Sequence, residues 1–463
     1  MKRFSLDDTI AAIATPLGEG GIGIVKISGP EACAILGQLF APASRARRAA
    51  STTGLIPRRL TFGEIIDPRT GVVVDQVLAV HMPAPHSYTR QDVVEIQAHG
   101  GIVPLRQILQ LTLMAGARPA EPGEMTLRAF LNGRLDLAQA EAVLDVVQAR
   151  TEAALRVATE QLEGKLSARV RTVRTQLVEV LAYLEASIDF VEDEIPPQEV
   201  LPPLQQVRAA LEEIVSTADR GLIYRQGIRA AIVGRPNVGK SSLLNRLLRG
   251  ERAIVTPIPG TTRDTLEETI NLEGVPLVLV DTAGIRAEAG DEVERIGVAR
   301  SRAALERADL ALLVVDGSQP LSEADHNIAA LIGRKPALLA VNKGDLPKVE
   351  LPGSFMPSAA RSSVSALTGE GVEALEEAIL ELVLGGQVSS TDTPLVSNPR
   401  HQAALERALD HLRAAQAGHQ SGLSADLLAI DVREAVDGLG EITGETAGED
   451  LLEAIFSSFC IGK

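Results

Sequence analysis

A chain of 463 residues exceeds the length of one ordinary hydrophobic core and predicts about three domains of roughly 150 residues each. The net charge of −16 argues against a protein that coats nucleic acid without specificity, because contacts to phosphates require lysine and arginine. Apolar residues make up 45% of the chain but aromatic residues only 2%, so leucine, valine, isoleucine and alanine must fill the cores. This composition suits helices and α/β sheets.

The cysteine content and the apolar runs indicate the compartment. Two cysteines, Cys33 and Cys460, cannot form a disulfide framework, and their scarcity indicates a reducing environment. Near the N-terminus, Asp7 and Asp8 interrupt the apolar segment that a signal peptide needs. The longest apolar runs, such as 310–315, are far shorter than the ~20 residues that cross a membrane. We therefore expect a soluble, cytoplasmic protein without membrane contact.

Residues 1–119 show mixed strand and helix patterns and predict an α/β domain. The expected strands are 9–15, 21–29, 60–66, 72–81 and 93–98, and the expected helices are 30–40 and 103–116. A basic cluster lies between them, in a stretch rich in alanine, serine, threonine and proline: Arg45, Arg47, Arg48, Arg58 and Arg59. A solvated loop is favoured over a nucleic-acid-binding patch for this cluster.

From about residue 120 the apolar residues repeat with a helical period. Asp136 followed by Gln139 forms an N-cap signal, and the helical pattern continues to about residue 190 with a break near Gly164. After a proline-rich stretch, one further helix is expected over 201–227. Strand and helix then alternate over 220–388, as in a parallel sheet, and the helical period returns over 389–463. Because the ends of an inserted domain usually lie close together, we expect 120–219 and 389–463 to pack as one helical domain.

The strand 228–233 leads into the phosphate-binding spacing G-x-x-x-x-G-K-S at residues 234–241. The glycines let the backbone N–H groups turn toward phosphate oxygens, and the following helix adds its positive N-terminal end. Lys240 is expected to reach the terminal phosphates, and the Ser241 hydroxyl to ligate magnesium. The full spacing between a strand and a helix favours nucleotide binding over a glycine-rich turn without a ligand.

Three further motifs select the nucleotide. DTAG at 281–284 supplies Asp281, which can hold magnesium through water, and Gly284, which allows close approach to the terminal phosphate. NKGD at 342–345 supplies Asp345, which can accept hydrogen bonds from the ring N–H and exocyclic amine of guanine; adenine lacks both donors. The stretch 365–367 resembles the loop that closes over guanine. Four motifs in this order predict a GTP-binding domain.

Hydrolysis requires a positioned water and charge stabilisation. In Ras-like enzymes a glutamine just after the switch-two glycine positions this water, but here that position is Ile285, which cannot. The acidic run Asp291, Glu292 and Glu294 lies just beyond it. The pattern alone does not choose among these three carboxylates.

Over its whole length the chain resembles the MnmE (TrmE) family of tRNA-modification GTPases, which are potassium-dependent. The resemblance is carried by the motifs TPLGEGGIGIVKISG, EIQAHGG, EPGEMTLRAFLNGRLDLAQAEA, GRPNVGKSSLLN, PGTTRD, DTAGIR, DEVERIG and CIGK. It implies an N-terminal α/β domain for tetrahydrofolate binding and dimerisation (1–119). It also implies a helical domain in two chain segments (120–219 and 389–463) and an inserted Ras-like P-loop GTPase domain (220–388).

The resemblance also implies the residues of the GTP site. The implied GTP contacts are Asn237, Val238, Gly239, Lys240, Ser241, Ser242, Thr256, Pro257, Ile258, Pro259, Gly260, Thr261, Thr262, Asp281, Thr282, Ala283, Gly284, Asn342, Lys343, Asp345, Ser365 and Ala366. The implied ion ligands are Asn237, Thr256, Ile258 and Thr261 for potassium, and Ser241 and Thr262 for magnesium. The potassium ion would supply the charge that an arginine finger supplies elsewhere. Glu294 matches the glutamate that orients the attacking water, and Arg263 and Asp264 fall in the switch-one motif, where they imply a dimer and ordering role.

For the N-terminal domain, the resemblance implies a 5-formyl- or methylene-tetrahydrofolate donor bound by Lys26, Glu95, Arg134 and Lys463. The family often has arginine at position 26 and lysine at position 134, so both exchanges keep the charge and change the donor geometry. Cys460 is either an exposed reactive thiol or a packed residue, and a structural or substrate-proximal role is favoured.

The activity that the resemblance implies is modification of the wobble uridine of certain tRNAs. A homodimer would act with MnmG, a flavin- and NADH-using partner, to add an aminomethyl or carboxymethylaminomethyl group at C5, while GTP hydrolysis opens and closes the G-domain dimer. Two other classes remain open. One is a GTP-gated switch in ribosome assembly, and the other is a folate-handling enzyme with a regulatory GTPase.

Overall fold

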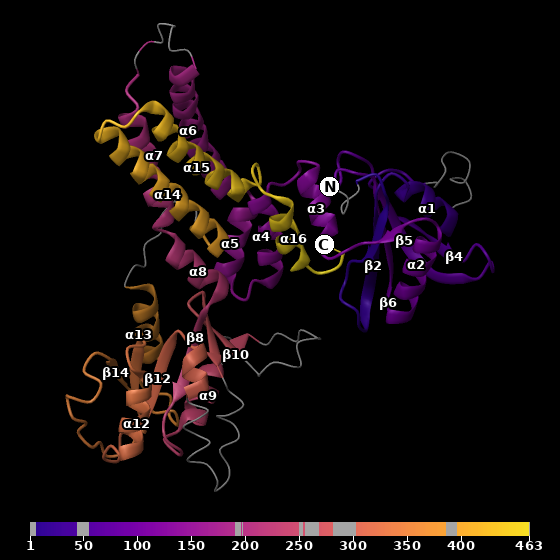
Figure 1. The fold of residues 1–463 in the computed structure, drawn as a ribbon. Coiled ribbons are helices and arrows are strands. Elements are labelled where there is room, and N and C mark those ends of the chain that lie inside the picture. Colours follow the sequence, from indigo (N-terminus) through magenta and orange to yellow (C-terminus); the bar gives the residue numbers. More distant parts are fainter. Residues whose placement is uncertain are drawn as a thin grey trace. The chain divides into compact units, whose positions relative to one another are not determined.

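The computed structural model describes residues 6–43, 55–189, 196, 198–249, 253–254, 268–280, 302–385 and 396–462. Within these ranges the chain forms two seven-stranded sheets and a set of long helices (Figure 1). It divides into two compact units: unit 1 comprises Met1–Leu144, Ser167–Arg174 and Val436–Lys463, and unit 2 comprises Asp145–Leu166 and Thr175–Ala435. In the described residues, no helix is long and apolar enough to cross a membrane.

The first sheet belongs to unit 1 and has the strand order β3-β4-β5-β6-β2-β1-β7. Its strands are β1 (Ile10–Ile13), β2 (Gly20–Ser28), β3 (Phe40–Pro42), β4 (Thr61–Ile66), β5 (Val73–Met82), β6 (Val93–Gly100) and β7 (Arg118–Pro119). All neighbours are antiparallel except β1 and β7, which run parallel. Helices α1 (Ala32–Leu39) and α2 (Ile102–Met114) pack on this sheet through one shared apolar core. The predicted strands and helices of this part are confirmed to within a few residues.

The remaining part of unit 1 is helical. It contains α3 (Glu124–Leu131), most of α4 (Leu137–Gln148) and α16 (Glu449–Ser457). Phe130, Phe456 and Phe459 pack between these helices, so the C-terminal helix joins the core of residues 124–144. The predicted N-cap at Asp136 is confirmed, because the Gln139 N–H donates to Asp136 Oδ1 at 2.9 Å and the Asp136 N–H donates to Gln139 Oε1 at 3.0 Å.

The helices of unit 2 are α5 (Glu152–Leu162), the larger part of α6 (Lys165–Asp189), α7 (Leu201–Val215), α8 (Ala218–Gln226), α14 (Pro399–Gln420) and the first part of α15 (Ala425–Thr443). The predicted break near Gly164 is confirmed: this glycine has φ +86° and separates α5 from α6. Ser397 Oγ donates to Gln161 Oε1 at 3.0 Å, across 236 residues of sequence. This bond joins the stretch before α14 to α5 within unit 2.

The single helix predicted over 201–227 is wrong, because α7 and α8 are separate helices. Between them, the Thr217 hydroxyl donates to the carbonyl of Ile214 at 2.7 Å and accepts from the N–H of Val396 at 3.1 Å. A Cβ at Gly221 would lie 2.1 Å from the carbonyl oxygen of Val396. The chain turns here, and α8 lies against the segment that begins at Val396. The local helical pattern of 201–227 contains no information about this distant contact.

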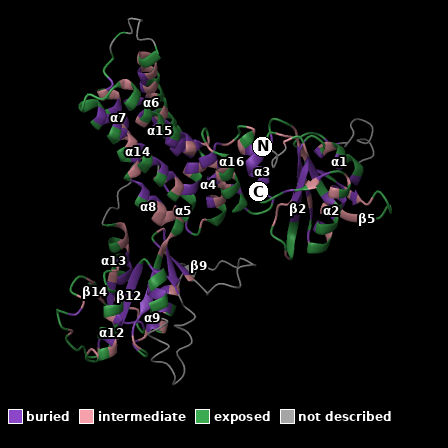
Figure 2. Cartoon of the chain, in the orientation of Figure 1, coloured by how far each residue is buried: buried purple, intermediate pink, exposed green. Residues whose placement is uncertain are grey.

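The second sheet lies in unit 2 and has the order β14-β13-β12-β8-β11-β10-β9. Its strands are β8 (Ile228–Val233), β9 (Ala253–Ile254), β10 (Glu268–Leu272), β11 (Val275–Val280), β12 (Leu310–Asp316), β13 (Ala337–Asn342) and β14 (Ala360–Ser363). The five strands from β14 to β11 are parallel, as predicted, and β10 and β9 add antiparallel pairs at one edge. Strands β11 and β12 of this sheet are buried throughout, and β8 is buried from Ala230 to Val233 (Figure 2).

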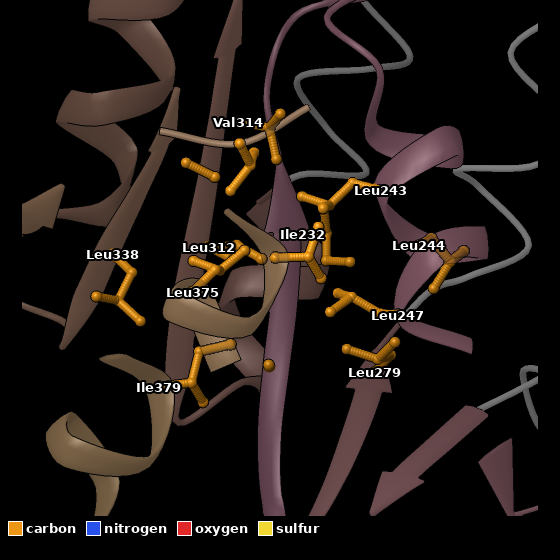
Figure 3. Packing of buried hydrophobic residues seen from close by; sticks show 14 of the residues in the cluster. Ile232, Leu243, Leu244, Leu247, Leu279, Leu312, Val314, Leu338, Leu375 and Ile379 are labelled. Atoms are coloured by element: carbon orange, nitrogen blue, oxygen red, sulfur yellow. The ribbon is translucent and has the colours of Figure 1, made fainter. Parts of the chain in front are cut away.

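Helices cover both faces of the second sheet, as a parallel sheet requires. Leucines of α9 (Lys240–Leu248) and apolar residues of α13 (Val372–Leu384) surround Ile232, Leu312 and Leu338 on one face (Figure 3). On the other face, Ile328 and Ile332 of α12 (Glu323–Ile332) join residues 304–308 against the same strands. With these layers, the predicted class of an α/β domain, a helical region and an inserted P-loop domain is confirmed.

Candidate functional site

The phosphate loop follows β8, the central strand of the second sheet. Gly234 has φ +156°, and a Cβ there would lie 2.4 Å from the carbonyl oxygen of Val314. Gly239 has φ +95°, and a Cβ there would lie 2.2 Å from Nδ2 of Asn342. Both positions therefore require glycine for backbone conformation and for space. This accounts structurally for the spacing that the sequence shows.

The residues between and after these glycines shape the loop. Val238 is fully buried in the core beneath it, whereas Asn237 is exposed and has φ +62°, a conformation that asparagine tolerates better than most residues. Lys240 is buried and its Nζ donates to the carbonyls of Gly234 at 2.7 Å and Arg235 at 2.8 Å. Helix α9 begins at Lys240, so its N-terminal N–H groups face the loop, next to Ser241 and Ser242. This end of the sheet can bind an anionic phosphate.

Asn342 joins the phosphate loop to the two base-recognition motifs. Its side chain is 2% exposed at the end of β13. Its Nδ2 donates to the carbonyl of Val238 at 2.7 Å, and its Oδ1 accepts from the N–H of Ala366 at 2.9 Å. The Ser365 hydroxyl in turn donates to Oδ1 of Asp345 at 2.6 Å. The structure therefore brings together three motifs that lie up to 132 positions apart in the sequence, from 234 to 366.

Asp316 is a member of this site that the sequence analysis missed. It ends β12, and its Oδ2 accepts from Nζ of Lys343 at 2.6 Å, while Oδ1 accepts from the Ser318 hydroxyl at 2.6 Å. Burial alone would raise the pKa of Asp316, but the hydrogen bonds from Lys343 and Ser318 outweigh it and lower the pKa. The pair holds Lys343, which has φ +65°, beside the strand end. The sequence does contain a signal for this residue: Asp316 is the one polar residue of strand β12, and it stands at the strand's end.

The following residues of the sequence analysis lie outside the described residues: Thr256, Pro257, Ile258, Pro259, Gly260, Thr261, Thr262, Arg263, Asp264, Asp281, Thr282, Ala283, Gly284, Ile285, Asp291, Glu292, Glu294 and Lys463. Two of the described strands lead toward these segments. Strand β9 ends at Ile254 and β11 ends at Val280, directly before Asp281.

A second candidate site lies in unit 1, where Lys26 of β2 pairs with Glu95 of β6 in register. Lys26 Nζ lies 3.4 Å from Oε1 of Glu95 and 5.8 Å from the ring centre of Tyr88. Arg134 Cζ lies 5.1 Å from the same ring, and its Nη1 donates to the carbonyl of Ser87 at 2.6 Å. Two of the four residues predicted to bind folate, Lys26 and Arg134, therefore lie against Tyr88, and a third, Glu95, pairs with Lys26.

Tyr88, one of only three tyrosines in the chain, was not among the residues predicted from the sequence. Its hydroxyl lies 2.9 Å from Oγ1 of Thr126, and burial raises its pKa, an effect that Thr126 and Arg134 only partly offset. The loop that carries it is fixed by two contacts of Thr89, whose Oγ1 lies 2.7 Å from Ser28 Oγ and whose carbonyl accepts from Asn132 Nδ2 at 2.6 Å. Tyr88 thus presents a positioned aromatic face to two cations.

The C-terminal residues return to this sheet. Ile461 forms a β-bridge with Pro122, and a Cβ at Gly462 would lie 2.6 Å from the carbonyl oxygen of Ile13. Cys460 is exposed, and its carbonyl accepts from the N–H of Gly123 at 3.4 Å. Strand β1 pairs with β2, and Ala12 lies opposite Lys26. The end of the chain therefore approaches the strand that carries Lys26, one of the residues predicted to bind folate.

Comparison with known proteins matches the whole chain. A family model described as the MnmE helical domain matches residues 137–460, and one described as the GTP-binding protein TrmE N-terminus matches residues 9–134. A protein named tRNA modification GTPase MnmE from Roseiflexus sp. (strain RS-1) is 52% identical over 470 residues, which cover 99% of each chain. Its namesake from Chloroflexus aurantiacus is 53% identical over 461 residues, 99% of this chain and 100% of the relative. Among solved structures, the G domain of the T. maritima FeoB iron transporter aligns with 34% of this chain and 98% of its own, at 26% identity and a TM-score of 0.25.

Proposed function

The chain belongs to the MnmE family of tRNA modification GTPases, and from this premise we propose that it is a potassium-activated GTPase that modifies the wobble uridine of certain tRNAs. It acts with MnmG and adds an aminomethyl or carboxymethylaminomethyl group at C5. The observation that carries the GTPase part of this proposal is the bridge made by Asn342, which holds the phosphate loop and the two guanine motifs in one site.

In the proposed GTP site, the loop N–H groups and Lys240 bind the phosphates, and Asp345 accepts from the guanine ring. Ser241 and Thr262 would hold magnesium, which would supply positive charge against the charge that develops during hydrolysis. Ser241 fits this role because it stands in the first turn of α9, beside the buried Lys240. The remaining proposed GTP contacts are those of residues 256–262, 281–284, 342–343 and 365–366.

Potassium is proposed to be held by the side chain of Asn237 and the carbonyls of Thr256, Ile258 and Thr261. The exposed amide oxygen of Asn237, on a loop aimed at phosphate, is the hard donor that such an ion prefers. When bound, the ion supplies positive charge beside the transferring phosphoryl group. Glu294 is proposed to orient the attacking water, since Ile285 has no polar group for that task. Arg263 and Asp264 are proposed to order the switch-one segment in the dimer.

The unit 1 site is proposed to bind 5-formyl- or methylene-tetrahydrofolate, which would supply one carbon to the tRNA modification. Two cations, one carboxylate and a positioned aromatic ring suit a ligand that carries a heteroaromatic ring with N–H donors and free carboxylates. Lys26, Glu95 and Arg134 would contact it, and Lys463 would join them from the chain end that packs beside β1.

We also propose a cytoplasmic homodimer with domains at 1–119, 120–219, 220–388 and 389–463, the second and fourth of which form one helical domain. GTP hydrolysis would drive opening and closing of the paired GTPase domains.

Nucleoside mass spectrometry of tRNA from cells that lack this chain tests the proposal. We expect the wobble-uridine modification to disappear, to return with the intact gene and the matched variant Glu292→Ala, and to stay absent with Glu294→Ala. An unchanged nucleoside profile in the deletion would contradict the proposal and favour the ribosome-assembly switch. Folate turnover by the purified protein without tRNA would favour the folate-handling enzyme.

A further inference from the structure

Three side chains with different metal-binding atoms converge in unit 1, outside the contacts of the two sites above. Cys33 lies in the first turn of α1, His81 near the end of β5, and Asp92 directly before β6. One sulfur, one ring nitrogen and one carboxylate oxygen of these residues all lie within 4.8 Å of one another. The backbone brings them together, because β5 pairs with β6 and the N–H of Gly29, just before α1, donates to the carbonyl of Asp92 at 3.0 Å.

The nitrogen of this group is buried without a partner, and the oxygen is oriented and partly exposed. Nε2 of His81 is buried and has no hydrogen-bond partner among the described residues; its nearest carboxylate atom is Oδ1 of Asp92, at 3.5 Å. Such a buried polar atom without a partner calls for an explanation, for which an ion is one of the ordinary candidates. The N–H of Ala84 donates to Oδ1 of Asp92 at 2.9 Å and orients the carboxylate, which is 33% exposed and so open to an incoming ion.

The donor set and spacing identify the metal class. A thiolate, an imidazole and a carboxylate suit zinc, whereas calcium and magnesium require oxygen ligands alone. Two nitrogen or oxygen ligands of a tetrahedral zinc lie about 3.3 Å apart, and the His81–Asp92 separation of 3.5 Å is close to that value. We propose that Cys33, His81 and Asp92 bind a zinc ion, with water in the fourth position, which ties α1 to the β5–β6 pair.

Zinc ligation by Cys33 requires that its thiol lose a proton. A zinc ion that forms the sulfur bond displaces this proton to solvent. The rival description is a histidine–aspartate pair beside an inert thiol, which binds no metal.

Metal titration of the full-length protein, after removal of metal with a chelator, tests the proposal. Zinc is titrated against a chromophoric competitor, and cobalt is used as a spectroscopic probe of thiolate ligation. We expect the unmutated chain and the control Cys460→Ser to bind one zinc per chain and to show the thiolate-to-cobalt charge-transfer band. Cys33→Ser should lose the band, and Asp92→Asn, which keeps an acceptor for the Ala84 N–H, should bind zinc at least about tenfold more weakly.

Zinc affinity and a cobalt spectrum that are unchanged in Cys33→Ser, or no stoichiometric zinc in the unmutated chain, would overturn the assignment. A second measurement needs no variant of the site. Alkylation followed by peptide mapping should show that zinc slows modification of Cys33 and leaves exposed Cys460 unaffected. Equal alkylation of Cys33 with and without zinc would also overturn it.

Discussion

The hydroxyl of Thr151 donates a hydrogen bond to the carbonyl oxygen of Gly274 at 2.7 Å and so joins the start of helix α5 to the β10–β11 hairpin. The same oxygen caps α5 by accepting from the N–H of Ala154 at 3.1 Å. Arg150 adds a bond from Nη1 to Oγ1 of Thr269 on β10, at 3.0 Å. Because β11 runs directly into residues 281–284, this contact links the helical segment of unit 2 to the stretch proposed to meet the terminal phosphate.

Replacement of Thr151 by valine is expected to loosen this hairpin. Valine keeps the shape but removes both the cap and the donor, and loss of the cap alone costs about 1 kcal/mol. Amide hydrogen exchange of residues 271–274 and of the first turn of α5 should accelerate, while that of buried β12 stays unchanged. Thr151→Ser, which keeps the hydroxyl, should resemble the unmutated chain. Equal protection in Thr151→Val would show that the contact does not hold the hairpin.

Gly239→Ala is expected to abolish nucleotide binding. The new Cβ would lie 2.2 Å from Nδ2 of Asn342, on a backbone with φ +95°, so the Asn342 bridge and the loop would both have to move. Gly353→Ala is the matched control, since nothing lies within 4 Å of its Cβ. Titration with a fluorescent GTP analogue should show binding by Gly353→Ala and none by Gly239→Ala. Normal binding by Gly239→Ala would contradict the described loop geometry.

Asp345→Asn is expected to change base preference. The Ser365 hydroxyl can still donate to the asparagine oxygen, so the loop is retained, but the charged acceptor for guanine is lost. Such an acceptor is worth about 1.5–3 kcal/mol, or roughly ten- to a hundredfold in affinity. Competition binding should show weaker GTP and stronger xanthosine triphosphate, which presents an oxygen where guanine presents its amine. Asp345→Ala should bind GTP more weakly and should not bind xanthosine triphosphate more strongly. Unchanged GTP affinity in both variants would show that Asp345 does not contact the base.

Asn237 provides a test of the potassium proposal. Asn237→Ala should bind GTP but lose stimulation of hydrolysis by potassium over sodium, because the amide oxygen is gone. Asn237→Gly should behave in the same way without strain at φ +62°, which separates loss of the oxygen from loss of loop shape. Steady-state hydrolysis rates in the two salts provide the comparison. Equal hydrolysis rates of the unmutated chain in potassium and in sodium would contradict the proposal that potassium activates the enzyme.

A buried ion network in unit 1 predicts acid sensitivity. Arg128, which is 1% exposed, donates to Oε1 of Glu124 at 3.0 Å and also contacts Asp8, while Arg118 Nη2 donates to Oε1 of Glu124 at 2.6 Å. Burial would raise the pKa of Glu124 and of Asp8, but the arginine hydrogen bonds outweigh it and hold both below their ordinary values of 4.5 and 3.8. Since the unfolded chain then binds more protons in acid, this stabilisation is complete above pH 4.5 and declines as the pH falls through the lowered values.

Glu124→Gln should therefore destabilise unit 1 at neutral pH by about 3 kcal/mol, because Arg128 loses a buried partner. The difference from the unmutated chain should shrink as the pH falls below 4.5, because the unfolded carboxylate is protonated first, and should vanish once the pH has fallen through the lowered pKa of the native carboxylate. Hydrogen exchange of strands β1 and β2 across this pH range measures the effect in unit 1. The exposed control Glu19→Gln should change little at any pH, and a Glu124→Gln difference that does not depend on pH would argue against the network.

Features that depend on a few neighbouring residues were predictable from the sequence. The Asp136–Gln139 cap, the break at Gly164 and the glycine spacing of 234–241 each arise from backbone conformation and hydrogen bonds within a short stretch. The order of strands and helices also follows from local apolar periodicity. Together with the motifs that resemble the MnmE family, these local patterns are enough to indicate the family.

Tertiary structure decided the contacts between distant stretches. The Asn342 bridge, the placement of Tyr88 between Lys26 and Arg134, and the turn at Thr217 each depend on which strands are neighbours and in what register. The convergence of Cys33, His81 and Asp92 is of the same kind. Local propensity carries no information on such pairings, because they are selected by burial of the whole core, and the polar contacts follow once the sheet and helices have packed.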